Sequence, residues 1–200
     1  MKPINFFTES ALTMGPALGA RRVSRRKYRL FAVACCRAGF ERITYPDCRA
    51  LVELVERWAD DESLGKEVSA LRRRVHAWAK QQPFGFSRWL GIFGAYHAAA
   101  PTGAPVPGFI YPRKNRALLA DIVGPIPRAT AFDPAWRTSD AVALARAMYD
   151  SRDFGAMPIL ADALQDAGCD DKELLAHCRS TKHPHARGCW VCDSVLSFGS

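Results

Sequence analysis

Apolar side chains recur at steps of three and four residues along most of this chain. The clearest series has steps of 4, 3, 4 and 3 and consists of Leu64, Val68, Leu71, Val75 and Trp78. Such steps place apolar side chains on one face of an α-helix, because a helix has about 3.6 residues per turn. We find no segment that alternates apolar and polar residues as a half-buried strand does. The pattern predicts an all-α fold, an irregular multi-helix bundle.

Caps and glycines predict where individual helices begin and end. Thr44 and Asp170 are expected to cap helix starts, because their side-chain oxygens can accept hydrogen bonds from the first free N–H groups. Gly124 and Gly168 are expected to stop helices. A further helix, rich in aromatic side chains, is expected between Phe86 and His97.

Proline and glycine interrupt the helical pattern most strongly in residues 101–112, PTGAPVPGFIYP. This segment contains four prolines and two glycines, a composition typical of a loop or linker. We therefore expect a basic N-terminal helical lobe over residues 1–100 and a C-terminal helical lobe over residues 113–200. With 200 residues, of which 48% are hydrophobic, the chain is long enough to bury a sizeable core.

The excess of positive charge lies entirely in the first half of the chain. Residues 1–100 contain 17 Lys and Arg against 9 Asp and Glu, whereas residues 101–200 contain 11 of each. The densest part is residues 21–37, where seven basic residues occur without an acidic one. Such a stretch can neutralise nucleic-acid phosphates. The candidate contacts are Arg21, Arg22, Arg25, Arg26, Lys27 and Arg29.

A solvated basic helix face explains the same charges more simply. Arg26 and Arg29 fall away from the apolar stripe of this helix. Tyr28 and Phe31 fall on the stripe, so they are not free to stack on bases. The chain also lacks a helix-turn-helix or RNA-binding signature. We favour the solvated face and keep nucleic-acid binding as the alternative.

The sequence shows no sign of export or of a membrane span. Apolar runs stay below the roughly 18 residues that a transmembrane helix needs. The N-terminal residues lack an apolar stretch followed by a small-residue cleavage site. Without export, the seven cysteines are expected to be free thiols. The sequence therefore predicts a cytoplasmic protein with no membrane partner.

The side chains best suited to chemistry gather between Met157 and Asp193. They are Cys169, Cys178, Cys189, Cys192, His177, His183 and His185. Zinc prefers Cys and His ligands, and the Cys-x-x-Cys spacing suits it. Helical geometry puts the Cα atoms of Cys169 and Cys178 about 12 Å apart, too far for one ion. The candidate zinc ligands are therefore Cys178, His185, Cys189 and Cys192, with His177 and His183 as substitutes.

Three other interpretations of this tail compete with zinc. The simplest has buried thiols and surface histidines with no cofactor, and we favour it. A redox pair of Cys189 and Cys192 is an alternative, although the neighbouring strand of such motifs is missing. Cys189 with His185 and Asp193 has the residue types of a nucleophile and its base, but spacing alone specifies no such geometry.

Four segments carry a family resemblance: Tyr28–Arg37, Phe132–Thr138, Met157–Cys178 and His185–Val191. They resemble a large paralogous family of bacterial proteins that is abundant in planctomycetes. The resemblance covers most of the chain and is most specific over residues 132–193. It departs from the family at Cys192, where relatives have valine, and in residues 122–128, which lack an Asn-Pro-Phe-type turn. The resemblance implies a shared fold and supplies no activity.

These observations favour a non-catalytic protein that acts by contact, as an interaction or accessory module with a protein partner. The expectation follows from the lack of a recognisable catalytic constellation. Nucleic-acid binding through residues 21–37 is the first alternative. A small zinc- or thiol-dependent protein that uses residues 177–192 is the second.

Overall fold

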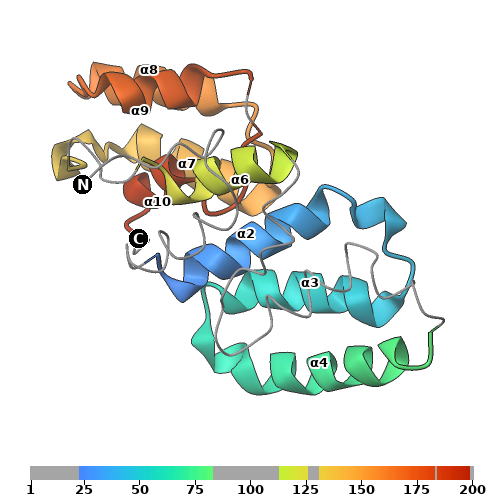
Figure 1. Ribbon diagram of the computed structural model, residues 1–200. Coiled ribbons are helices and arrows are strands. Elements are labelled where there is room, and N and C mark those ends of the chain that lie inside the picture. The colour runs from blue at the N-terminus through green and yellow to red at the C-terminus, as the bar shows by residue number, and fades with distance from the viewer. Residues whose placement is uncertain (1–22, 83–112, 126–130, 183, 199–200) are drawn as a thin grey trace. The chain divides into compact units, whose positions relative to one another are not determined.

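The computed structural model describes residues 23–82, 113–125, 131–182 and 184–198 (Figure 1). These residues form helices and turns and contain no strand, so the expected all-α fold is confirmed. No helix in these segments has both the length and the apolar character that crossing a membrane requires. The expected 101–112 loop and the aromatic helix from Phe86 to His97 lie outside the described residues.

The described residues divide into two compact units, with the boundary between Asn115 and Arg116. This boundary falls inside a helix, whereas the sequence suggested a change of lobe across residues 101–112. The described part of the first unit contains α2 (Arg25–Arg37), η1 (Phe40–Arg42), α3 (Pro46–Trp58), η2 (Glu62–Leu64) and α4 (Gly65–Ala79). Helix α3 packs against both α2 and α4.

The core of the first unit confirms the periodic series that predicted α4. Val68 and Val75 are completely buried against α3, and Leu64, Leu71 and Trp78 pack at the edge of the same core. The Trp78 ring stacks on Tyr45, with centroids 4.0 Å apart. Tyr45, and not Thr44, is the cap residue of α3. Because Pro46 at the helix start lacks an N–H group, a side-chain cap has one fewer donor to satisfy there.

The burial of Arg29 on α2 corrects the interpretation of the sequence. We expected it to lie away from the apolar stripe, but only 2% of it is exposed. Its guanidinium lies 3.4 Å from the centre of the Trp58 ring, and Nη1 donates a 2.6 Å hydrogen bond to Glu62 Oε1. An aromatic face and a carboxylate together let a charged group be buried. Hydrophobic periodicity alone does not reveal such partners.

Helix α6 (Arg113–Val123) begins in the first unit, and most of it belongs to the second. The second unit also contains η5 (Pro134–Trp136), α7 (Ser139–Ser151), α8 (Met157–Asp166), α9 (Lys172–Arg179) and α10 (Trp190–Val195). Helix α8 packs against α7 and α9, and α10 packs against α7. All four cysteines of the tail lie in the core that these helices share, so the expected burial of the thiols is observed.

Local signals correctly predicted most helix ends in this unit. Gly124 and Gly168 both have positive φ and follow α6 and α8, as expected for helix stops. The cap of α9 is Asp171 rather than Asp170, and its Oδ1 accepts from the N–H groups of Glu173 and Leu174. Two adjacent aspartates have the same capping chemistry, so residue type alone does not distinguish between them.

Candidate metal centre

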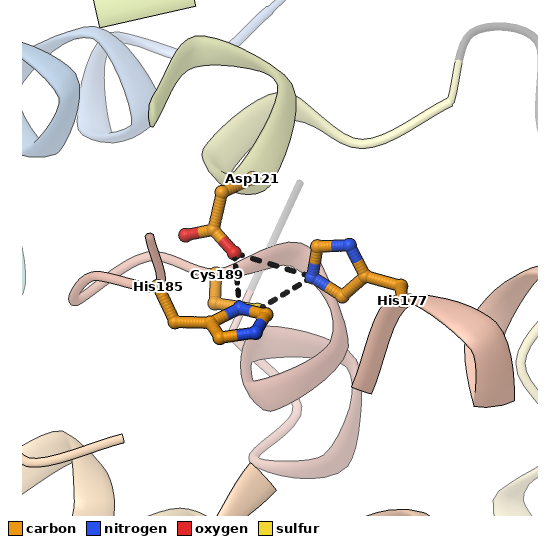
Figure 2. Close-up of side chains that lie close together, drawn as sticks. All are labelled: Asp121, His177, His185 and Cys189. Carbon is orange, nitrogen blue, oxygen red and sulfur yellow. Dashed lines mark hydrogen bonds and ion pairs between the residues drawn. The ribbon is translucent and has the colours of Figure 1, made fainter. Parts of the chain in front are cut away.

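Four side chains from separate parts of the second unit converge on one point (Figure 2). They are Asp121 from the last turn of α6, His177 from α9, His185 from the loop after α9, and Cys189 at the start of α10. Each offers one potential ligand atom, and these four atoms lie within 4.8 Å of one another. The cluster therefore brings two imidazoles, one carboxylate and one thiol together.

The end of α6 sets the position of Asp121. The helix stops at Gly124, whose N–H group donates to the carbonyl oxygen of Ala120. Gly124 lies directly against the side chain of Trp190, the first residue of α10. This contact holds the last turn of α6 at the start of α10, so Asp121 and Cys189 are brought to the same place.

The distances within the cluster resemble those between ligands of one metal ion. Asp121 Oδ1 lies 2.7 Å from His185 Nδ1 and 3.2 Å from His177 Nε2. His177 Nε2 lies 3.3 Å from Cys189 Sγ. Ligands bonded at about 2.0–2.3 Å to a tetrahedral zinc ion lie roughly 3.3–3.6 Å apart. Small side-chain movements would therefore suffice to admit an ion.

Burial and charge make these four groups strongly dependent on one another. Burial by itself would raise the pKa of Asp121, but the hydrogen bonds and charges of His177 and His185 hold that pKa below its usual value. Burial would lower the pKa of His177, yet Cys189 and Asp121 raise it to about 9. Asp121 raises the pKa of His185 to about 10 against the same effect of burial. Without a metal ion, protons on the imidazoles balance the buried carboxylate.

One further hydrogen bond and one unpaired nitrogen atom define the surroundings of the cluster. The backbone N–H of Ala186 donates to Asp121 Oδ2 at 3.0 Å, which fixes the carboxylate plane. The Nε2 atom of His185 is buried and has no hydrogen-bond partner. A buried polar atom without a partner is costly. The opposite ring nitrogen of His185, Nδ1, is the one that faces Asp121.

His177 does not have the geometry of the base in a Cys–His–Asp catalytic relay. Such a relay uses opposite nitrogens of one imidazole, one toward the nucleophile and the other toward the carboxylate. His177 instead turns the same atom, Nε2, toward both Cys189 and Asp121. Burial also raises the pKa of Cys189 well above its usual value, which disfavours a free thiolate. Several lone pairs that point to one centre are typical of metal ligands.

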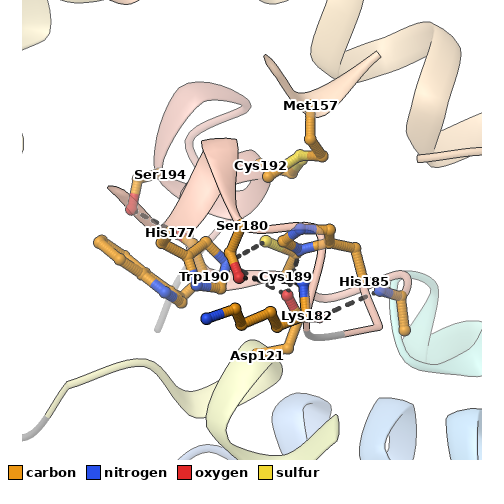
Figure 3. A network of polar contacts seen from close by, with 11 residues as sticks. Asp121, Met157, His177, Ser180, Lys182, His185, Cys189, Trp190, Cys192 and Ser194 are labelled. Carbon is orange, nitrogen blue, oxygen red and sulfur yellow. Dashed lines mark hydrogen bonds and ion pairs between the residues drawn. The ribbon is translucent and has the colours of Figure 1, made fainter. Parts of the chain in front are cut away.

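Part of the predicted zinc set is present in the cluster. His185 and Cys189 belong to it, and His177, a predicted substitute, belongs to it as well. Cys178 and Cys192 are buried in the neighbouring core and do not. The Sγ atom of Cys192 instead contacts Met157 Sδ at 3.7 Å (Figure 3).

Asp121 was missed by sequence reasoning, and His183 lies outside the described residues. Asp121 is 64 residues from His185 in the chain. The available signal was its place in α6, since an acid between Leu118 and Ile122 falls on the apolar face of that helix. Asp193, the proposed third member of a nucleophile group, is buried in α10 and is not part of the cluster.

The predicted nucleic-acid contacts are only partly exposed. Arg21 and Arg22 lie outside the described residues, and of the other four only Arg25 is exposed. Arg26 pairs with Asp60 at 2.8 Å. Lys27 and Arg29 are both 2% exposed. The four described side chains therefore do not form one open basic face.

Comparison with known proteins adds no assignment. No protein-family model, curated protein or solved structure matches this chain. The resemblance to the bacterial family stays a prediction, and the geometry of the cluster carries the functional argument.

Proposed function

We propose that Asp121, His177, His185 and Cys189 hold one zinc ion in a closed structural site, and that the helical unit so stabilised acts by contact with a protein partner. The observation that carries this proposal is the convergence of the four ligand atoms within 4.8 Å in a buried position. The role is that of a metal-stabilised interaction or accessory module.

The mixture of ligands favours zinc over other common ions. Magnesium and calcium prefer oxygen ligands, and monovalent copper prefers sulfur. Two imidazoles, one thiolate and one carboxylate suit an ion of intermediate softness with tetrahedral geometry. Zinc meets both conditions, and cobalt(II) can report the same site spectroscopically.

The environment of the ligands supports a structural role over a catalytic one. Four protein ligands complete a tetrahedral shell, whereas catalytic zinc sites keep one position for water or substrate. The side chain of Asp121 is completely buried, and Cys189 is equally inaccessible. A substrate would have to displace one of these groups to reach the ion.

Binding at this site would connect elements that the sequence separates widely. The ligands come from α6, α9, the following loop and the start of α10. Because a preformed site rarely exists in an unfolded chain, metal binding contributes directly to folding stability. The ion would hold the end of α6 and the 180–188 loop in place, and the surface of the unit would then be rigid enough to bind a partner.

Metal analysis of the purified, reduced full chain tests this proposal. We expect one zinc ion per chain, and the absorption spectrum of tetrahedral cobalt(II) with a thiolate ligand after exchange. Cys189→Ala should lose the ion and the thiolate band. Cys178→Ala is the matched control, because it removes a buried thiol of the same core that is not a ligand. Wild-type protein without bound metal, or Cys189→Ala protein that retains it, would contradict the proposal.

A further inference from the structure

We infer that Cys189 and Cys192 form an oxidation site at which hydrogen peroxide creates a disulfide and thereby releases the metal ion. The inference rests on the proposed metal centre and assigns its regulation. In it, Cys189 is the ligand and the attacking sulfur, and Cys192 is the resolving sulfur.

The backbone places the two cysteines at a distance that a disulfide can span. Cys189 is the cap residue of α10, and Cys192 is the third residue of that helix. The N–H of Asp193 donates to the carbonyl oxygen of Cys189 at 2.9 Å, so the helical turn already includes Cys189. Residues three apart on a helix have Cα atoms about 5–5.5 Å apart, within the roughly 4.4–6.8 Å of disulfides.

The side chains of this pair also lie close together. Cys192 is near enough to Cys189 to add to the effect of burial in raising the pKa of the Cys189 thiol, and its own sulfur contacts Met157 Sδ at 3.7 Å. Figure 3 shows Cys192 close to Met157 and apart from the imidazoles. Cys192 is therefore beside the ligand sulfur without being a member of the metal cluster. A second thiol in this position can resolve an oxidised ligand.

Metal binding provides the reactive form of Cys189. A thiol bound to a metal is deprotonated, and a thiolate attacks peroxide where a buried thiol does not. Both sulfurs are completely buried, which favours a small oxidant such as hydrogen peroxide over a bulky disulfide.

The chemistry balances in two steps. The Cys189 thiolate attacks one oxygen of hydrogen peroxide; the O–O bond breaks, a sulfenic acid forms and hydroxide leaves. The Cys192 sulfur then attacks the sulfenic sulfur, the S–O bond breaks, and the thiol proton leaves with the oxygen as water. The two sulfurs are oxidised by two electrons and the peroxide is reduced. The metal loses its only thiolate ligand and its affinity falls.

The test uses the full chain, reduced, loaded with one equivalent of Zn²⁺ and freed of reductant. Hydrogen peroxide is added, released zinc is followed with a chromogenic chelator, and thiols are counted. We expect loss of the ion and a fall from seven free thiols to five. The tryptic peptide that begins at Gly188 contains both cysteines and should become lighter by two hydrogen atoms. A thiol reductant should then restore metal binding.

Two variants separate the resolving role from simple burial. Cys192→Ala should bind zinc when reduced but should not recover metal binding after peroxide, because its Cys189 is oxidised beyond the sulfenic acid. Cys178→Ala removes a thiol that is not part of the Cys189–Cys192 pair. This variant should behave like the wild type. The change in peptide mass is measured on the wild type, so it does not depend on how well either variant folds.

Several results would overturn the inference and leave the metal centre in place. They are a disulfide from Cys189 to Cys178, metal release with all seven thiols intact, retention of both ion and thiols, and retention of zinc after the Cys189–Cys192 disulfide has formed. Reduced protein that binds no ion would overturn the inference and the proposed function together.

Discussion

Gly124 and Trp190 touch so closely that a β-carbon on residue 124 would lie 2.6 Å from Trp190 Cγ. Gly124 also has a φ of 73°, which side chains other than glycine rarely adopt. The end of α6 and the start of α10 therefore meet only because residue 124 is glycine. Asp121 lies one helical turn from this contact, and Cys189 lies one residue from it. These two are the completely buried members of the metal cluster.

Gly124→Ala should destabilise the protein by roughly 2–4 kcal/mol, from backbone strain together with the clash against Trp190. It should also weaken zinc binding, because the end of α6 must move away from α10. Gly168→Ala is the control, since Gly168 has a φ of 89° but open space around its Cα. It should cost only about 1–2 kcal/mol and leave zinc binding unchanged. Denaturant unfolding and metal titration of both variants measure these effects. Equal losses in the two variants would show that the contact with Trp190 is unimportant.

Asp121→Asn should lower zinc affinity by at least about tenfold to a hundredfold, the range found even for residues that only support metal ligands. The amide preserves the shape of the side chain but removes the negative charge that faces both imidazoles. Asp162→Asn is the matched control. The Asp162 side chain is exposed, and its ion pair within the described part of the second unit is with Arg179 at 2.7 Å. Competition with a chelator of known affinity measures both. Unchanged affinity in Asp121→Asn would remove this residue from the ligand set.

Zinc binding should release protons and strengthen as pH rises toward about 10. In the metal-free protein the pKa of His177 is raised to about 9 and that of His185 to about 10, so both imidazoles are protonated at neutral pH. The ion must displace these protons and the Cys189 thiol proton. Calorimetric titration in buffers of different ionisation enthalpy counts the protons released. A zinc affinity that does not change between pH 6.5 and pH 9 would contradict the assignment of both histidines.

The stability of the metal-free protein should change in the opposite direction. A group whose pKa is raised in the folded state stabilises the fold. This stabilisation is complete at pH values below the unfolded pKa of 6.5, and it is lost as the pH rises through the folded pKa. The metal-free protein should therefore unfold more easily at pH 9–10 than at pH 6.5. Thermal unfolding with and without zinc measures this. His177→Gln should reduce the pH dependence of stability in the metal-free protein. If this variant keeps the full wild-type pH dependence, His177 does not contribute to it.

Arg29→Lys should destabilise the first unit by roughly 1–3 kcal/mol, because an ammonium group cannot lie flat on Trp58 while donating to Glu62. Glu62→Gln is the control. The Glu62 side chain is 74% exposed, so loss of its charge should cost less than about 1 kcal/mol. Denaturant unfolding compares them. A neutral Arg29→Lys variant would mean that the stacking contact contributes nothing measurable.

Helix positions were largely predictable because the interactions that define them are local. The helix stop at Gly124 depends on residues two to four positions away, and so do the side-chain caps that Asp133 provides to η5 and Thr138 to α7. The series through Val68 and Val75 likewise predicted a buried face of one helix. Prediction missed two caps by one residue. At Asp171 a second aspartate of equal capping ability stood next to it, and at Tyr45 the helix begins without a side-chain cap.

The candidate site was predictable only in part. The tail indicated that His185 and Cys189 could bind metal, but it also suggested Cys178 and Cys192. His177 and Cys178 are neighbours on α9, so their side chains point about 100° apart and only one can face the cluster. Which one does so depends on how α9 packs against the rest of the unit.

By itself, the sequence determined that this protein is helical, where most described helices begin and end, and that its tail carries metal-binding residue types. Those properties follow from the period of apolar residues and from contacts within a single turn. Only the tertiary structure decided that Asp121 completes the cluster, that His177 and not Cys178 faces it, and that Arg29 is buried. Each of these depends on residues distant in the chain, or on the packing of whole helices, which no local pattern encodes.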